Sequence, residues 1–368
     1  MDRFVHLHNH TMYSPLDGMI RPAELVQRAA KLGQRAVAVT DHGLMGALPQ
    51  FYMEAKKHDV IPILGQEFYI TPDAQDKSHR NNFHIVLLAL DETGYRLLAE
   101  LSSIANQPEN FYYDARIDHT ILKHYRRKLR NHVACLSGCL SSELQRAIAA
   151  GDEYRDLMEF YQQIFQDYYY IEIQQHLLRE QKSLSGIEDE EDKKFAKLQK
   201  RNNRVLWDLA AEYKLPVAIT NDCHYLLKSD HMAHDLMLAM QTGAKLEDPK
   251  RFRFNGDDYW LMPGDHMARK FTTEHWKRGL AGVNHLVDAV NIDIPEFNSK
   301  VFHIPAYGVN SIEVIAETCR SVLRKRKYPQ VYWDRFEKEI DIIRKANFAD
   351  EILVVKDYVE AARTGALN

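Results

Sequence analysis

Residues 36–43 read Ala-Val-Ala-Val-Thr-Asp-His-Gly, and this stretch decides the fold. A short, continuous apolar run of this kind predicts a buried strand. The strand ends in Asp41 and His42, two side chains that are able to bind a metal ion. An Asp-His pair alone is a common turn element, so the interpretation depends on whether the same pattern recurs elsewhere in the chain.

The pattern does recur, because short apolar runs alternate with helical patterns up to residue 230. We expect strands at residues 3–7, 36–40, 60–64, 84–90, 132–136, 168–173 and 216–219, and helices at 22–32, 45–58, 93–104, 141–149, 153–165 and 190–213. This alternation implies a parallel sheet, either open or closed as a barrel. Beyond it we expect only helices, at residues 231–242, 274–290, 312–326, 333–345 and 351–362.

Candidate metal ligands follow five of the expected strands within a few residues. They are His8 and His10, then Asp41 and His42, then Glu67, then Cys139, and finally Asp222 and His224. The carboxyl ends of the strands of a parallel barrel open on one face, so these side chains are expected to converge there. The period of two along a strand also places both imidazoles of a His-x-His pair on the same face.

Imidazoles combined with carboxylates suit Zn²⁺, Mn²⁺ or Fe, and a carboxylate such as Glu67 can bridge two ions. Such a cluster can hold a phosphate and generate hydroxide near neutral pH, so we expect in-line hydrolysis of a phosphoester. Each residue also has a structural interpretation. Cys139 can be a small buried hydrophobe, and Asn221-Asp222 can be a helix cap or a turn. The joint pattern, and no single residue, favours a metal site.

The composition limits the partners and the compartment. Lys and Arg total 48 and Asp and Glu total 52, which gives a net charge of −4. A nucleic acid must therefore be held by a local patch or by metal ions. Four cysteines in a chain of 368 residues do not predict a disulfide framework. With neither a signal peptide nor a membrane helix evident, we expect a cytoplasmic protein without a membrane partner.

Several longer motifs fit one known family. They are His8-Asn9-His10-Thr11, Tyr13-Ser14, Leu16-Asp17-Gly18, residues 38–43, residues 62–67, residues 84–90, Leu136-Ser137-Gly138-Cys139-Leu140 and residues 220–225. In order and spacing they resemble the PHP domain of bacterial DNA polymerase III alpha subunits. The resemblance implies an α/β fold, a distorted (β/α)7 TIM-like barrel, over residues 1–290. It implies a connector at 291–310, and a helical segment at 311–368 that resembles the entry to the polymerase palm.

The resemblance also implies a set of site residues. The nine metal ligands are His8, His10, Asp17, His42, Glu67, His84, Cys139, Asp222 and His224, for up to three divalent ions (Zn, Mn or Fe, with Mg also compatible). Catalytic roles are expected for His10, Asp17, Glu67 and Asp222. Asp41 is expected to orient a ligand imidazole from outside the metal shell. His6, His79 and His176 are off the pattern, and we interpret them as structural.

An intact ligand set implies a 3′–5′ exonuclease that proofreads the product of a polymerase, acting on a single-stranded DNA 3′ end. The polymerase's catalytic aspartates follow this region in the family, so nucleotide addition is not expected from residues 1–368. Two alternatives stay open. One is a scaffolding module that docks to a separately encoded polymerase chain and other replisome subunits. The other is a freestanding PHP phosphatase.

Contacts with DNA are less defined by the sequence. Residues 123–130 read Lys-His-Tyr-Arg-Arg-Lys-Leu-Arg, and this basic run predicts either a solvated helix face or a contact with phosphates. Tyr13, beside the first metal motif, is predicted either to stack on a terminal base or to pack against the protein.

Overall fold

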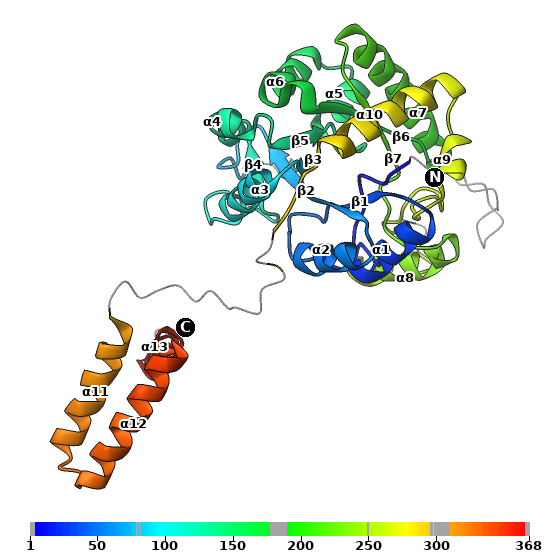
Figure 1. Cartoon of the computed structure of the whole chain (residues 1–368). Helices are drawn as coiled ribbons and strands as arrows, with labels where there is room; N and C mark the ends of the chain where they lie inside the picture. The colour runs from blue at the N-terminus through cyan, green and yellow to red at the C-terminus, as the bar shows by residue number, and fades with distance from the viewer. Residues whose placement is uncertain are drawn as a thin grey trace. The chain divides into compact units, whose positions relative to one another are not determined.

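Seven strands of the described residues form one sheet, in the order β1-β2-β3-β5-β6-β7 with β4 beside β2 (Figure 1). The computed structural model describes residues 4–78, 80, 82–176, 190–248, 250–294, 297 and 310–364. The strands are β1 Ala36–Val39, β2 Ile61–Thr71, β3 Phe83–Ala89, β4 Arg116–Asp118, β5 Val133–Leu136, β6 Tyr169–Gln174 and β7 Val217–Thr220. The α/β class expected from the sequence is confirmed.

The expectation of an all-parallel sheet is wrong at β3, which runs antiparallel to both β2 and β5. The other pairs, β1 with β2, β2 with β4, β5 with β6 and β6 with β7, are parallel. A parallel connection needs a crossover of about a dozen residues or more, usually a helix. Between β2 and β3 the described residues contain no helix, and β2 itself continues to Thr71, past its expected end. The two long strands therefore return directly on one another.

The regular N-terminal strand expected from the sequence is not formed by the described residues before His8. The segment nevertheless lies between the two ends of the sheet. Ala38 N–H donates to the carbonyl of His6 at 3.0 Å, on the β1 side. Cys223 N–H donates to the carbonyl of His8 at 3.2 Å, just beyond β7. Because the carbonyls of His6 and His8 accept hydrogen bonds from different ends of the sheet, no continuous ladder forms. The segment nevertheless joins both edges of the curled sheet.

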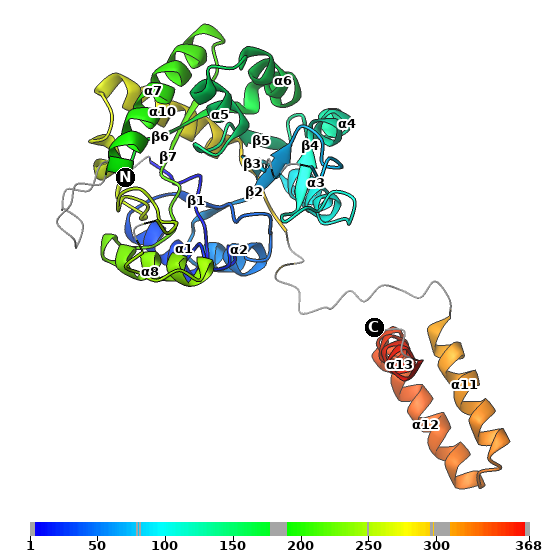
Figure 2. The same cartoon turned by 180° about the vertical axis from the view of Figure 1, so that it is seen from behind.

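Helices cover both faces of this sheet. They are α1 Pro22–Lys31, α2 Leu48–Lys57, α3 Glu92–Ala105, α4 His119–Leu129, α5 Glu143–Ala150, α6 Arg155–Phe165, α7 Glu190–Glu212, α8 His231–Thr242, α9 Gly264–Ala268 and α10 Thr273–Ala289, with 3₁₀ turns η1 Gln166–Tyr168 and η2 Lys228–Asp230. From β1, Val37 and Val39 pack into the large core that includes residues of α1 and α2. These two helices lie side by side in both views (Figure 1, Figure 2).

The other face of β1 packs toward α10. Ala36 and Ala38 share a second core with Val283 and Leu286 of that helix. The approach of α10 to β7 is close: a Cβ at Gly282 would lie 2.0 Å from a backbone carbonyl of β7. Only glycine fits at such a distance. The helix thereby fills the inside of the curled sheet, and the loops at the carboxyl ends of β1, β5 and β7 remain free to carry polar side chains.

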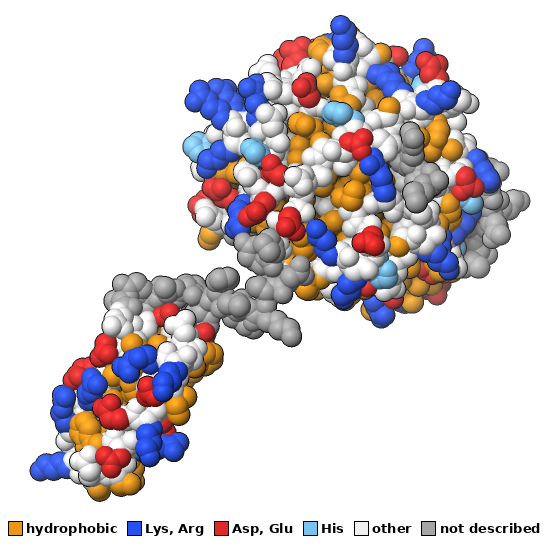
Figure 3. All heavy atoms as spheres, viewed as in Figure 1, with side chains coloured by type: hydrophobic (Ala, Val, Ile, Leu, Met, Phe, Trp, Pro, Cys, Tyr) orange, Lys and Arg blue, Asp and Glu red, His pale blue; other side chains and the backbone are white. Residues whose placement is uncertain are grey.

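Most predicted helices and strands are confirmed within a few residues, but β4 and the short helix α9 were not expected, and α4 was expected only as one interpretation of its basic run. The three residues of β4 include Arg116, whose side chain is fully buried. Its guanidinium donates to backbone carbonyls, among them that of Asn110 at 3.2 Å. A charged residue inside so short a strand conceals the apolar pattern. The basic run that follows is helix α4, and Lys and Arg side chains gather over it on the surface (Figure 3).

The chain divides into two compact units, residues 1–298 and residues 299–368. The second contains α11 Ser311–Lys325, α12 Gln330–Ala346 and α13 Ala349–Thr364, which enclose a small core around Ile315, Phe336 and Ile340. These three helices were all expected from the sequence.

In the part of the chain that the structure describes, no helix is long and apolar enough to cross a bilayer. All four cysteines are free thiols.

Candidate metal centre

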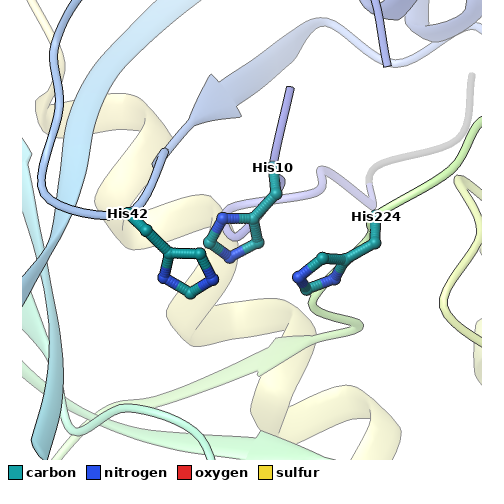
Figure 4. Close-up of side chains that lie close together, drawn as sticks. All are labelled: His10, His42 and His224. Atoms are coloured by element: carbon teal, nitrogen blue, oxygen red, sulfur yellow. The ribbon is translucent and has the colours of Figure 1, made fainter. Parts of the chain in front are cut away.

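The structure brings all nine sequence-predicted ligands together at one end of the sheet, and we call this group the ligand cluster. Its members are His8 and His10 of the N-terminal segment, Asp17 of the next loop, His42 after β1, Glu67 in β2, His84 at the start of β3, Cys139 after β5, and Asp222 and His224 after β7. Three imidazoles from segments far apart in the sequence point toward one another in Figure 4.

One part of the ligand cluster is formed by His8, His10 and Asp222, and both imidazoles are fully buried. The Nε2 atoms of the two imidazoles are 3.1 Å apart. Asp222 Oδ1 lies 3.3 Å from His8 Nε2 and 3.1 Å from His10 Nε2. Three donor atoms therefore surround one point, which is the arrangement that a metal ion requires. Asp222 adopts a left-handed backbone conformation, with φ of 50°, which is uncommon for a residue other than glycine and is typical of functional sites.

Glu67 lies between the group of His8, His10 and Asp222 and the strand β3. Its Oε2 is 2.7 Å from His42 Nδ1 and 3.4 Å from His10 Nε2. Its Oε1 is 3.1 Å from His84 Nδ1, and Cys139 Sγ lies 3.8 Å from the same oxygen. The two carboxylate oxygens thus face different groups of donors. A carboxylate in this position is suited to bridge two ions.

The third part of the ligand cluster is organised by Asp17. Its Oδ2 lies 2.8 Å from His42 Nε2 and 3.5 Å from His224 Nε2. The ring of His10 stacks between these two imidazoles, with centroid distances of 4.1 Å to His42 and 4.3 Å to His224. His42 therefore uses one nitrogen toward Glu67 and the other toward Asp17, and it joins the parts of the cluster.

The hydrogen bonds around His8 and His10 leave one nitrogen of each imidazole suited to bind a divalent ion. His8 Nδ1 is 2.7 Å from Glu172 Oε1, and His10 Nδ1 is 3.2 Å from Ser14 Oγ. When each Nδ1–H donates to its oxygen, each Nε2 directs a lone pair into the cluster, and two lone pairs 3.1 Å apart repel unless a cation lies nearby. Three further buried atoms, Glu67 Oε2, Asp222 Oδ1 and His224 Nε2, lie near other donor atoms of the cluster but form no hydrogen bond of suitable geometry. Buried polar atoms are almost always satisfied, so these three atoms fit the binding of a cation.

The electrostatics of the ligand cluster favour cations. Burial would raise the pKa of Glu67, but the neighbouring imidazoles of His84, His42 and His8 hold it well below its ordinary value. Burial and the neighbouring His42 and His224 lower the pKa of His10 to about 3, so this imidazole stays neutral and able to bind metal. Protons and divalent ions compete for the same donors, and metal binding therefore weakens as the pH falls.

Asp41 lies next to the ligand cluster but contacts a loop and no imidazole ring nitrogen. Its carboxylate accepts hydrogen bonds from Thr11 N–H at 2.6 Å and Thr11 Oγ1 at 2.7 Å. It also accepts from Ser14 Oγ at 2.8 Å, and Ser14 in turn contacts His10 Nδ1. Asp41 thus positions His10 through Ser14, and it holds the loop that carries Asp17.

The sequence did not reveal Glu172, a fully buried carboxylate in β6. In addition to its contact with His8 Nδ1, its Oε1 accepts hydrogen bonds from Thr220 Oγ1 and from Gln174 Nε2 at 3.0 Å. A carboxylate that accepts the outer N–H of a metal-binding imidazole fixes its tautomer and raises its basicity. The sequence feature that could have identified Glu172 is the presence of an acidic residue inside an otherwise apolar strand.

Replacing Glu172 with Gln is expected to weaken metal binding by roughly 10- to 100-fold, because His8 loses the charge that fixes its tautomer. The change keeps the size of the side chain, so the strand is expected to fold. Metal titration of the purified variant measures the affinity. Glu109→Gln, at an exposed loop position, removes the same charge as a control. Equal affinities in both variants and the wild type would show that Glu172 has no such role.

The off-pattern residues have other partners. His6 Nε2 is 2.8 Å from the carbonyl of Met262, and His176 Nε2 is 3.1 Å from the carbonyl of Asn221. Both rings are buried and take part in local packing, with His176 stacked on Tyr259 at 4.0 Å between centroids. His79 lies outside the described residues.

Tyr13 is partly buried and packs against the large core. A Cβ added at Gly46 would come within 3.0 Å of its ring. It is not among the described residues that line the pocket over the ligand cluster. Stacking of Tyr13 on a base stays a prediction.

A pocket with a volume of about 490 Å³ opens above the ligand cluster. Six of the nine predicted ligands line it: Asp17, His42, His84, Cys139, Asp222 and His224. Its walls carry several aromatic rings and two arginines: Tyr69, Phe195, Phe252, Phe254, Tyr259, Arg146 and Arg253. The arrangement offers metal donors below and stacking surfaces with positive charge above.

The chain is similar in sequence to several known proteins. Residues 6–176 match the PHP domain family. A DNA polymerase III subunit alpha of Deinococcus radiodurans is 34% identical over 333 residues, which cover 86% of this chain and 23% of the relative. The corresponding protein of Aquifex aeolicus is 30% identical over 389 residues, covering 98% of this chain and 31% of the relative. The chain therefore spans less than a third of the length of these relatives.

Two solved structures show a distant similarity. A two-domain protein from Bacteroides vulgatus, containing a predicted PHP-like metal-dependent phosphoesterase, matches 66% of this chain and 55% of its own, at 15% identity and a TM-score of 0.35. An amidohydrolase from Chromobacterium violaceum matches 60% of this chain and 87% of its own, at 18% identity and a TM-score of 0.28.

Proposed function

The chain carries a PHP domain and is homologous over most of its length to DNA polymerase III alpha subunits, and on that premise we propose that it removes nucleotides from single-stranded DNA 3′ ends. The reaction is hydrolysis of a phosphodiester, with up to three divalent ions held by the ligand cluster. The observation that carries the proposal is the convergence of nine potential metal ligands in one cluster, six of which line the pocket above it. We further propose that this activity serves proofreading in the cytoplasm.

The ligand cluster has an inner and an outer layer, and these define where a substrate binds. The side chains of His8, His10 and Glu67 are at most 1% exposed. Those of Asp17 and Asp222 are 16% and 12% exposed and line the pocket. The outer carboxylates therefore lie on the substrate side of the site, where ions that they bind would meet a phosphate, while the inner layer keeps the donors fixed.

Bound divalent ions would supply Lewis acidity and a lowered pKa for water at this site. The chain's own contribution is to position the reacting groups, exclude bulk water and keep the carboxylates ionised. Burial would raise the pKa of Asp222, but His8 and His10 hold it far below its ordinary value. Burial likewise opposes the ionised form of Asp17, yet His224 and His42 hold its pKa well below the usual range. We propose catalytic roles for His10, Asp17, Glu67 and Asp222.

The walls of the pocket favour a nucleotide over a small phosphate ester. Phe252 is 54% exposed, although a large apolar side chain normally avoids water, and Phe254 and Tyr259 lie in the same wall. Aromatic rings in this setting stack on bases regardless of sequence. Arg146 of α5 is exposed at the pocket, and among the described residues its guanidinium forms no ion pair. It is free to contact a phosphate.

Replacing Arg146 with Ala is expected to lower kcat/KM on a single-stranded oligonucleotide by roughly 10- to 100-fold. A hydrogen bond to a charged group contributes about 1.5–3 kcal/mol, and each 1.4 kcal/mol corresponds to tenfold. Metal content and hydrolysis of bis(p-nitrophenyl) phosphate are expected to stay unchanged, because neither needs the wall of the pocket. Steady-state kinetics on both substrates provide the measurement, with Arg21→Ala on the surface of α1 as a control.

An equal loss of activity on both substrates would contradict this role for Arg146. Faster hydrolysis of phosphomonoesters than of DNA by the wild type would instead favour the freestanding phosphatase.

The scaffolding alternative has its own support in the second unit. There Val331, Ile342 and Tyr358 are exposed by more than half, as is typical of surfaces that pack against further polypeptide. A metal-loaded protein that cleaves neither substrate would favour that alternative.

A further inference from the structure

Helix α4 presents a basic stripe to solvent. Lys123, Arg126, Arg127 and Arg130 follow the spacing i, i+3, i+4, i+7, which places them on one side of the helix. All four side chains are exposed. A neighbouring side of the helix, with Leu122, Tyr125 and Leu129, is buried in the large core. The helix is thus fixed by its apolar side, and the direction of the basic stripe is determined by the fold.

The basic stripe forms one wall of a groove against α6. The groove has a volume of about 440 Å³, and its other wall consists of Phe160, Gln163 and Ile164. No acidic side chain lines it among the described residues. The ammonium of Lys123 lies 5.4 Å from the ring centroid of Phe160. Figure 3 shows the resulting patch of Lys and Arg over α4.

The four cations lack acidic partners within the described part of the chain. Their neighbour Lys128 reaches Glu100 at 4.0 Å, but no ion pair is formed by Lys123 or by any of the three arginines of the stripe. Glu159 of α6 faces elsewhere and accepts a hydrogen bond from Tyr213 OH at 3.2 Å. Surface arginines outside the groove do pair, as Arg155 does with Glu212 at 2.6 Å.

A solvated helix face explains this arrangement only in part. Cations in the last turn of a helix are favoured by its dipole, which accounts for Arg126 and Arg127. Lys123 lies further from that end. Like charges at positions i and i+4, as in Lys123 with Arg127 and Arg126 with Arg130, destabilise a helix by about 0.2–0.5 kcal/mol per pair. The stripe therefore costs stability unless an anion binds it.

We propose that the α4–α6 groove binds the sugar–phosphate backbone of a nucleic-acid strand. The groove shares no lining residue with the pocket over the ligand cluster, so it is a second, non-catalytic contact. Seven residues of helix rise about 10 Å, which spans roughly three phosphates at ~3.4 Å per nucleotide. Guanidinium groups bind phosphate oxygens in pairs, and Phe160 offers a ring beside them. The net charge of −4 makes such a local patch necessary for electrostatic binding.

The test is fluorescence anisotropy of a labelled oligothymidine in the presence of a chelator, at a temperature where the metal-free chain is folded. Without metal the strand is not cleaved, so the result does not depend on the proposed hydrolysis. Arg126→Gln/Arg127→Gln is expected to weaken binding at least tenfold. It is also expected to reduce the slope of log K against log salt by about 1.4, since each contact with a single strand contributes ~0.7. Arg21→Gln/Lys31→Gln, at exposed positions at the two ends of α1, removes the same charge as a control.

An equal loss of binding in the two double variants would overturn the proposal, because it would show that net charge alone matters. Polyglutamate that binds as tightly as the oligonucleotide would also overturn it, in favour of an acidic protein partner. Competition by inorganic tripolyphosphate at the oligonucleotide's own affinity would reduce the site to one for small anions, which likewise contradicts it. Melting curves of both variants that match the wild type support a local effect.

Discussion

Replacing His10 with Ala is expected to reduce degradation of single-stranded DNA by roughly a thousandfold or more. His10 Nε2 lies in two of the three groups of donors in the ligand cluster, one with His8 and Asp222 and one with His42 and His224. Its loss therefore affects more than one metal position. Metal ions contribute several kcal/mol to phosphoester hydrolysis, and about 4 kcal/mol corresponds to a thousandfold in rate. Release of nucleotides from an end-labelled oligonucleotide in Mn²⁺ or Zn²⁺ measures the effect.

His58→Ala is the matched control, since this histidine lies at the exposed end of α2 and contacts the surface residue Glu54 at 3.1 Å. His10→Asn serves as a second variant if the alanine change lowers the yield of folded protein. Rates equal to the wild type in both His10 variants would falsify the assignment of the metal centre as the active site. Reduced rates in the control as well would point to a general effect on the protein.

Removal of the metal ions is expected to lower the melting temperature of the chain by roughly 5 °C or more. Ions that bind only the folded state stabilise it by about 2.7 kcal/mol at a concentration 100 times their Kd. For a large domain, 1 kcal/mol shifts the melting temperature by about 2–4 °C. The physical reason is that the folded chain brings Asp17, Glu67 and Asp222 together with the imidazoles of the cluster, whereas the unfolded chain leaves these donors apart.

Thermal melting before and after dialysis against a chelator, followed by return of Zn²⁺ or Mn²⁺, measures this stabilisation. A variant that combines Asp222→Asn with His224→Ala is expected to melt at the same temperature with and without metal. A wild type whose melting temperature ignores the chelator would contradict metal binding by the folded chain.

The sequence was sufficient for β1, β2, β5, β6 and β7, because each expected strand is short, apolar and bounded by polar residues, but it predicted a regular strand before His8 that does not form. It could not place His84 by the argument from parallel strands. His84 begins a strand, and only the antiparallel direction of β3 brings this residue beside Tyr69 and the end of β2. The family resemblance supplied the residue, and the structure supplies the reason for its position.

Other features depend on contacts between distant segments, which periodicity does not encode. Glu172 contacts His8, which lies 164 residues away in the sequence. It lies within β6, whereas most predicted ligands follow the end of a strand. The closing role of the N-terminal segment depends on hydrogen bonds to residues near β7. The basic run of α4 was ambiguous for the same reason, since the acid-free groove appears only once α6 packs beside it.

The central claim is that an occupied polynuclear site hydrolyses DNA, and the metal content of the purified chain, determined together with its 3′–5′ exonuclease activity on the same sample, tests it most directly. The account predicts more than one ion per chain, approaching three, with activity that rises and falls with occupancy and is lost in Asp222→Asn. Full activity with less than one ion per chain, or a fully loaded site that releases no nucleotides, would contradict it.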